Sequence, residues 1–167
     1  MRPSAIELAS GHPALTAAVQ RGRRLLHRRA LVAAAAGAVP VPGLDWAVDA
    51  ALLTRMIPQI NAEFGLMPDQ LDRLTPHERE RVQRAITMVG SVLIGKLITR
   101  DLVLKAAQMV GMRLTARQAA RFVPVAGQVA SAVIGYTAIR YLGEEHLKDC
   151  VRVALKAQLR LPHPPGR

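Results

Sequence analysis

Aromatic residues make up only 3% of this 167-residue chain, although 50% of its residues are hydrophobic. Proteins that bind single-stranded nucleic acid rely on aromatic rings on which the bases stack, so the composition argues against that function. Ala, Val and Leu dominate the hydrophobic residues, and such small side chains let helices approach closely, in soluble bundles and in membranes. A chain of this length fits one domain with a sizeable core.

Cysteine is nearly absent, since Cys150 is the only one. A single cysteine excludes a disulfide framework and a thiolate metal cluster. The histidines are scattered, and none has a partner at the spacing of metal ligands; they are His12, His27, His77, His146 and His163. No local pattern indicates a Ser or Cys nucleophile either. The sequence therefore predicts a protein that is not an enzyme and that has no metal or cofactor.

Long apolar runs are also scarce. Leu31–Leu44 has no charge but is short and contains two prolines. Phe122–Ile139 is eighteen uncharged residues long, at the lower end of the roughly 17–25 that cross a bilayer, and it contains Pro124 and Gln128. Hydropathy alone thus leaves the membrane question open.

The run Leu31–Val39 follows Arg28-Arg29, which superficially resembles a signal peptide. It begins about thirty residues into the chain, later than an ordinary secretory signal. We therefore expect no cleaved signal, and we expect the protein in the cytoplasm or at the cytoplasmic face of the inner membrane.

Charge is abundant and mostly of one sign. The net charge is +11, with 23 Lys and Arg against 12 Asp and Glu. This balance favours anionic partners, such as acidic lipid headgroups, an acidic protein face or duplex nucleic acid. An Arg-rich and Ala-rich composition can also reflect genomic base composition.

Every long periodic segment has the helical period, and no alternating strand pattern occurs. We expect an all-α protein, a single bundle of about six to eight helices. The predicted organisation is a flexible N-terminus at 1–13, one helical domain at 14–160 and a Pro-rich tail at 161–167.

Capping residues set the expected helix ends. The first long helix must stop before Pro40, and Gly65 suits the end of the second. Thr75 with Glu78 forms a capping box before a helix that continues to Leu97. The expected helices cover 14–39, 44–64, 68–74, 76–97, 101–110, 127–142 and 144–160.

A Val-Pro-Val-x-Gly pattern occurs twice, at Val39–Gly43 and Val123–Gly127. Proline ends one helix and glycine lets the chain turn, so each copy predicts a helix–break–helix hairpin. The residues that make the two breaks are Pro40, Pro42, Gly43, Pro124 and Gly127.

After the second break, Gly127, Ser131 and Gly135 fall four residues apart. This small-residue ridge suits a close helix contact in a membrane. Ordinary core packing in a soluble bundle explains it equally well.

The segment Gly90–Leu97 imitates a phosphate-binding loop, with two glycines and Lys96. It has Leu97 where a magnesium-binding Ser or Thr is needed, and it lies in a continuous helical pattern. We therefore expect no nucleotide site.

Asp45 and Asp49 are four residues apart near a helix start. Two carboxylates can bind a cation or perform acid–base chemistry. Interaction with the helix dipole, or burial as a polar pair beside a neighbouring Arg or Lys, explains them better because no third ligand is nearby.

The last helix carries a basic stripe, Lys148, Arg152, Lys156 and Arg160, beside apolar residues. Such a helix can lie on an anionic bilayer, or it can dock on the core with the stripe in solvent.

The segments Val39–Leu53, Asn61–Leu66 and Arg121–Gly127, with Tyr136 and Tyr141 after them, resemble two helical domains. One is the C-terminal helical region of immunity-related GTPases, and the other is the uncharacterised domain of YcjF-like bacterial membrane proteins. The resemblance covers roughly Ala30 to Ala154 in order. It implies a helical fold and a membrane-linked role, and it provides no catalytic residues. Nothing in these residues resembles a true phosphate-binding loop or a guanine-specificity motif, so we expect no GTPase domain in this sequence.

The leading hypothesis is a helical domain that acts at a membrane through its small-residue hairpins and basic helices. The alternative is a soluble adaptor for a separate protein, such as a GTPase. Nucleic acid is the weakest candidate partner, and the sequence does not indicate an oligomeric state.

Overall fold

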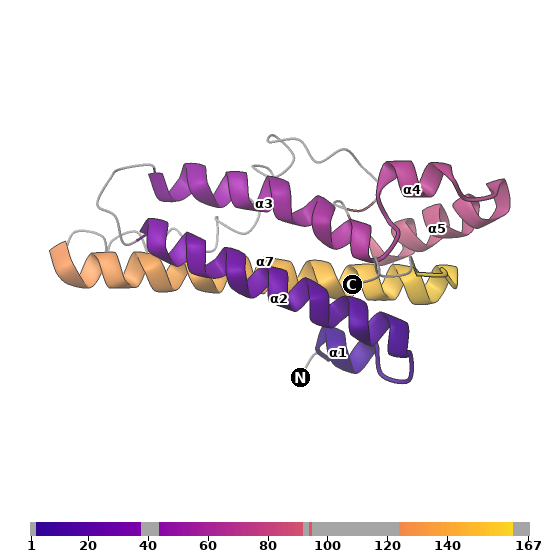
Figure 1. Ribbon diagram of the computed structural model, residues 1–167, viewed down its shortest axis with the longest axis horizontal. Helices are drawn as coiled ribbons and strands as arrows, with labels where there is room; N and C mark the ends of the chain where they lie inside the picture. Colours follow the sequence, from indigo (N-terminus) through magenta and orange to yellow (C-terminus); the bar gives the residue numbers. More distant parts are fainter. Residues whose placement is uncertain (1–2, 38–43, 92–93, 95–123, 162–167) are drawn as a thin grey trace, which may run out of the picture. The chain divides into compact units, whose positions relative to one another are not determined.

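The computed structural model describes residues 3–37, 44–91, 94 and 124–161, and all regular elements among them are helices (Figure 1). The predicted all-α fold is confirmed. The helices are α1 (Ala5–Leu8), α2 (Pro13–Gly37), α3 (Leu44–Glu63), α4 (Pro68–Asp72), α5 (Pro76–Val89) and α7 (Pro124–Ala157).

The chain divides into two compact units. Unit 1 is built from Met1–Arg24, Ile57–Leu97 and Gly143–Arg167, and unit 2 from Leu25–Met56 and Ile98–Leu142. The boundaries fall inside α2, α3 and α7. The single domain expected over 14–160 stays a prediction.

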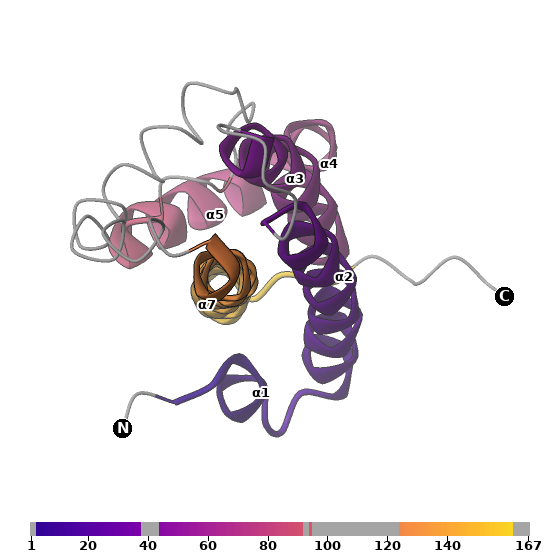
Figure 2. The same cartoon turned by 90° about the vertical axis from the view of Figure 1, so that its left-hand side faces the viewer.

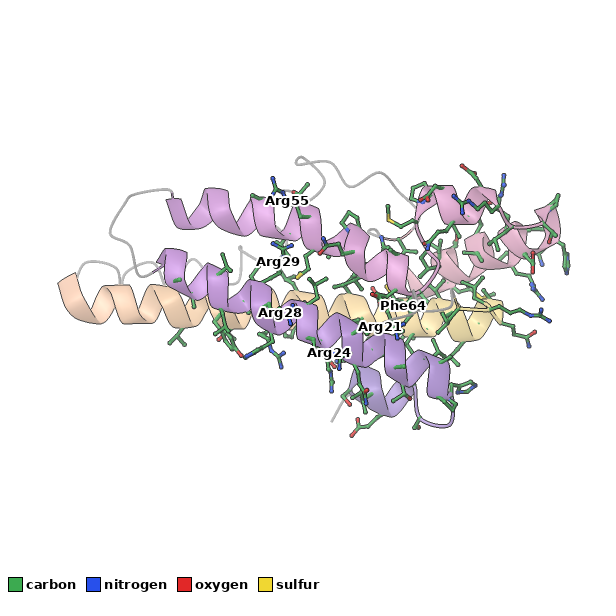
Figure 3. All side chains as sticks on the ribbon, viewed as in Figure 1. Arg21, Arg24, Arg28, Arg29, Arg55 and Phe64 are labelled. Atoms are coloured by element: carbon green, nitrogen blue, oxygen red, sulfur yellow. The ribbon has the colours of Figure 1, made fainter. Side chains whose placement is uncertain are left out.

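The C-terminal half of α7 is the central helix of unit 1. In Figures 1 and 2 it lies beside α1 and beside the N-terminal half of α2. Its apolar residues are buried together with Phe64, which is labelled in Figure 3, and with Val82 of α5. Burial of a large side chain contributes about 1.5–3 kcal/mol relative to leaving it exposed. The fully buried side chains of unit 1 include Phe64, Leu66, Val82, Ile94, Leu147, Val151 and Val153.

Helix α5 begins with the capping box that the sequence predicts. The Thr75 hydroxyl accepts a hydrogen bond from the Glu78 amide, and the Glu78 carboxylate accepts one from the Thr75 amide. The end differs from the prediction, because α5 stops at Val89 instead of continuing to Leu97. Gly90 adopts a left-handed conformation, with φ of 73°, and its amide donates to the carbonyl of Ile86. A residue without Cβ adopts that conformation at little cost, so glycine closes the helix there.

The N-terminal segment 1–13 contains the short helix α1, and its predicted flexibility stays a prediction. Ser4 and Glu7 form a reciprocal capping box, and Ala5 and Ala9 are fully buried. The Ala5 amide also donates to the Glu144 carboxylate of α7, at 3.0 Å. A four-residue helix has little stability of its own, so this tertiary contact explains why periodicity did not reveal it.

The helix boundary predicted near Gly143 is wrong, whereas the break predicted at Pro124–Gly127 stays a prediction because the residues before Pro124 lie outside the described ones. Helix α7 begins at Pro124 and continues for 34 residues to Ala157. Proline is well suited to the first turn, where its missing amide has no intrahelical partner to lose. A glycine inside a helix costs about 1 kcal/mol relative to alanine, which the packing of a long helix readily offsets.

Unit 2 contains the C-terminal half of α2, the N-terminal half of α3 and the N-terminal half of α7. Its buried residues include Leu26, Ala30, Ala33, Leu53, Met56 and Ile139. Helix α2 ends at Gly37 and α3 begins at Leu44, so the helix ends on either side of the first break agree with the prediction. The break residues Pro40, Pro42 and Gly43 lie outside the described residues.

Candidate functional site

The outer face of α2 in unit 2 exposes apolar side chains. Leu31 is 51% exposed and Val32 is 50% exposed. They lie one turn after His27 and Arg28, which are also exposed. Single exposed hydrophobic residues are normal on protein surfaces, but a group of them beside cations is typical of an interaction surface.

Helix α7 contributes to the same surface. The Tyr136 hydroxyl and His27 Nδ1 are 3.4 Å apart, and the two rings meet edge to face with centroids 6.4 Å apart. Val133, which precedes Tyr136 by one turn, is 58% exposed. Within unit 2 these two helices run in opposite directions (Figure 1), so Leu31 and Val133 lie toward the same end from the His27–Tyr136 contact. We call this set the α2–α7 surface: His27, Arg28, Leu31, Val32, Val133 and Tyr136.

Three arginines of unit 2 add positive charge on α2 and α3. Arg28 and Arg55 are exposed, and Arg29 is half-buried (Figure 3). No carboxylate in the described part of the chain forms an ion pair with any of them.

The predicted basic stripe of the last helix is not one exposed surface. Lys148 is 7% exposed and its ammonium pairs with Glu145 at 2.7 Å, while Arg152 pairs with Asp149 at 3.2 Å. Arg160 lies beyond the end of α7. A four-residue step advances about 40° around a helix, so the stripe turns from the buried side toward solvent. Lys156 is exposed within the helix, and Arg160 is exposed after it.

The side-chain surroundings of two other predicted sites lie outside the described residues. Asp45 and Asp49 lie in α3, and Gly127, Ser131 and Gly135 lie in α7. The buried polar pair and the helix-packing ridge therefore stay predictions. Within the described ranges, no group of three or more His, Cys, Asp or Glu side chains is placed to hold a metal ion.

Unit 1 has a buried polar cluster that the sequence analysis missed. His146 Nε2 lies 2.8 Å from Asn61 Oδ1, and Cys150 Sγ lies 3.7 Å from the same oxygen. Cys150 Sγ and His146 Nε2 are 3.6 Å apart. His146 and Cys150 are four residues apart on α7, a spacing visible in the sequence, whereas Asn61 comes from α3. Only the fold brings the third residue to the pair.

This cluster combines Cys, His and Asn, the residue types of a cysteine protease site, but its geometry does not suit that chemistry. In such a site one imidazole nitrogen faces the thiol and the other faces the orienting residue. Here the same nitrogen, Nε2, faces both partners. Burial also raises the pKa of the Cys150 thiol and lowers the pKa of His146 to about 4. Both groups are therefore neutral near pH 7, and neither is accessible to a substrate.

A second polar contact holds three helices of unit 1 together. The Glu144 carboxylate of α7 receives hydrogen bonds from the Arg23 guanidinium of α2 and from the Ala5 amide of α1. Burial acts to raise the pKa of Glu144, but the hydrogen bonds and the charge of Arg23 outweigh it, and the pKa is lowered. The carboxylate therefore stays ionised.

Comparison with known proteins finds one informative similarity. The chain is 29% identical over 149 residues to interferon-inducible GTPase 5 of Rattus norvegicus, covering 84% of this chain and 32% of the GTPase. The chain thus spans about a third of the length of this relative. The match supports the part of the resemblance that concerns immunity-related GTPases. No family model matches the chain, and no solved structure matches it.

Proposed function

We propose that this chain is a non-catalytic helical domain that attaches to an anionic membrane surface, at its cytoplasmic face, through the α2–α7 surface. The observation that carries the proposal is the position of Leu31 and Val32, each about half exposed, about one turn beyond the exposed cation Arg28. Apolar side chains beside arginines suit the boundary between acyl chains and acidic headgroups.

The expected strength is modest. Transfer of a Leu or Val side chain from water contributes about 1.5–3 kcal/mol when complete, and these are already half-buried. Each arginine near an anionic leaflet adds about 1 kcal/mol. A few such contributions support reversible peripheral attachment. No helix among the described residues is long and apolar enough to cross a bilayer.

The last helix, one of the membrane-contacting elements that the sequence suggested, is not assigned to attachment. The C-terminal half of α7 is the core helix of unit 1, with Leu147, Val151 and Ala154 buried. Those apolar residues are unavailable to lipid unless unit 1 opens. The proposal therefore assigns attachment to α2 and to the N-terminal half of α7.

Vesicle co-sedimentation tests this proposal. The protein is mixed with phosphatidylglycerol–phosphatidylcholine vesicles or with pure phosphatidylcholine vesicles, at low and high salt. We expect binding to the anionic vesicles only, and a reduction of about tenfold or more in the Leu31→Ser, Val32→Ser double variant. The matched control is Met88→Ser, because Met88 is 72% exposed on α5 of unit 1.

Charge is tested separately. Arg28→Glu should weaken binding to the anionic vesicles, whereas Arg84→Glu on α5, which pairs with Glu80, should have little effect. Equal binding of both surface variants and the unmodified protein would remove the α2–α7 surface from the mechanism. Absence of binding to any vesicle would reject membrane attachment itself.

A second function, an adaptor for a separate GTP-binding protein, is favoured by a different observation. The similarity covers only 32% of a GTPase, so a domain of this kind accompanies other protein parts in that relative. Vesicles that contain no second protein distinguish the two functions. An adaptor is not expected to bind them, so binding of the purified chain to anionic vesicles contradicts the adaptor as the sole function, and absence of such binding favours it. The resemblance to YcjF-like membrane proteins stays a prediction, and it would support membrane attachment over the adaptor function.

A further inference from the structure

The buried imidazole of His146 is suited to its neutral form, in which the ring carries one proton. Its side chain is 3% exposed in the core of unit 1, and Nε2 lies 2.8 Å from Asn61 Oδ1. The carbonyl oxygen of an amide only accepts, so the contact assigns the ring proton to Nε2. Nδ1 is then an unprotonated nitrogen, and it is buried without a hydrogen-bond partner among the described residues.

Charged side chains of α2, α3 and α7 in the described part of unit 1 form ion pairs with one another. On α2 and α3, Arg21 pairs with Glu63. Between α2 and α7, Arg23 pairs with Glu144. On α7 itself, the pairs are Lys148 with Glu145 and Arg152 with Asp149. Cys150 is the other titratable group in contact with the ring, and burial keeps its thiol protonated.

A proton on Nδ1 would create an N–H donor without an acceptor and a positive charge in an apolar site. Burial of an unpaired charge is strongly unfavourable, so the protonated imidazole is accommodated only when water reaches it. Water reaches His146 when α7 separates from α3, which breaks the Asn61 contact.

We propose that the Asn61–His146–Cys150 cluster is an acid-sensitive latch, and that mild acid loosens the C-terminal half of α7 from unit 1. This half also carries Glu144, which binds α1 and α2, and Leu147, which packs on Gly22 of α2. Opening therefore affects the contacts of α7 with α1, with α2 and, through Asn61, with α3. It also exposes Leu147, Val151 and Ala154, which are buried in the closed unit.

The direction follows from the two protonation states. The folded protein protonates His146 at about pH 4, below the ordinary value of 6.5. Between these values the unfolded or opened form binds more protons, so stability falls as the pH falls. From pH 7 to pH 5 the equilibrium constant for opening should rise about 20-fold.

Hydrogen exchange by mass spectrometry at pH 7 and pH 5, corrected for the intrinsic rates, measures this opening in the full chain. We expect faster exchange of the α7 amides around residues 146–154 and about a 20-fold change in their opening constant. His146→Gln, which retains an N–H donor for Asn61 but does not titrate, should abolish the pH dependence. His77→Gln, on the exposed start of α5, is the matched control and should leave it unchanged.

Two results would overturn the latch. One is an opening constant for residues 146–154 that is equal at pH 7 and pH 5. The other is a His146 imidazole that titrates near pH 6.5 in the folded protein by NMR, which also decides the matter if His146→Gln does not fold. Vesicle binding is not part of either readout, so the latch and the membrane proposal stand or fall separately.

Discussion

Gly22 of α2 lies directly against Leu147 of α7. A Cβ built on Gly22 would stand 2.6 Å from the Leu147 Cδ2 atom, closer than real side chains approach. Leu147 is fully buried, so its side chain has little freedom to move away. The contact explains why a residue that weakens helices is present in the middle of α2.

Gly22→Ala should therefore destabilise unit 1. Alanine improves helix propensity by about 1 kcal/mol, whereas overpacking of a core costs about 1–3 kcal/mol. We expect a net loss of about 1 kcal/mol in the free energy of unfolding, measured by urea denaturation. In a Leu147→Ala background the clash is absent, so the same substitution should become stabilising. An equal effect of Gly22→Ala in both backgrounds would show that the two residues are not coupled.

Glu144→Gln should loosen α1 and α2 from α7. The carboxylate is partly buried, and it receives a charged hydrogen bond from Arg23 as well as the Ala5 amide. Loss of the charge should lower the free energy of unfolding by about 1–2 kcal/mol. Glu80→Gln, in an exposed pair with Arg84, is the control and should change it by less than about 0.5 kcal/mol.

The same carboxylate gives a pH dependence of its own. The pKa of Glu144 is lowered from 4.5, so its contribution is complete above that value and is lost as the pH falls below it. In the unmodified protein, denaturant midpoints should decline more steeply below pH 4.5 than in Glu144→Gln. Parallel declines would assign the acid sensitivity in that range to other carboxylates.

Thr75→Ala should test the cap of α5. The hydroxyl satisfies the Glu78 amide at 3.3 Å and donates to the Glu78 carboxylate at 2.7 Å. Removal of such a cap costs about 1 kcal/mol. Thr87→Ala is the matched control, since the Thr87 hydroxyl only donates to the Gln83 carbonyl within the same helix. Equal stabilities of the two variants would indicate that the capping box contributes nothing.

Gly65→Ala should destabilise the turn between α3 and α4. Gly65 has φ of 71°, in the left-handed region, and Phe64 and Leu66 beside it are fully buried. Alanine in that conformation costs about 1 kcal/mol. A Gly65→Asn variant should lose less, because asparagine tolerates left-handed backbone better, and thermal unfolding of the two variants gives the comparison.

Local signals predicted helix ends well wherever a cap or a proline determines them. The ends near Gly37, Leu44, Gly65 and Thr75 were all expected from residues close in sequence. The helix α1 was not, because the Glu144 carboxylate that receives its first amide is 139 residues away. The continuity of α7 through Gly143 was also missed, because tertiary packing outweighs the helix-weakening effect of a glycine and the local sequence does not show that packing.

The candidate site shows the same division. The pair Arg28-Arg29 beside the apolar run was evident in the sequence, but the exposure of Leu31 and Val32 depends on which face of α2 the core covers. Helical spacing marked Lys148 and Arg152 as part of a basic stripe. In the structure, however, they form ion pairs with Glu145 and Asp149. The Asn61–His146 contact joins residues 85 apart, which no pattern along the chain reports.

The construction of unit 1 from three separate stretches of chain has a consequence for its synthesis. The Ala5 amide and the Arg23 guanidinium find their partner only at Glu144, so neither contact can form while the ribosome is still adding the residues between them. Contacts this distant in sequence slow the search for the native state. Helices α1 and α2 are synthesised before the part of α7 that covers them, so their apolar faces are exposed in the nascent chain. Such exposed surfaces are where chaperones bind and where aggregation begins.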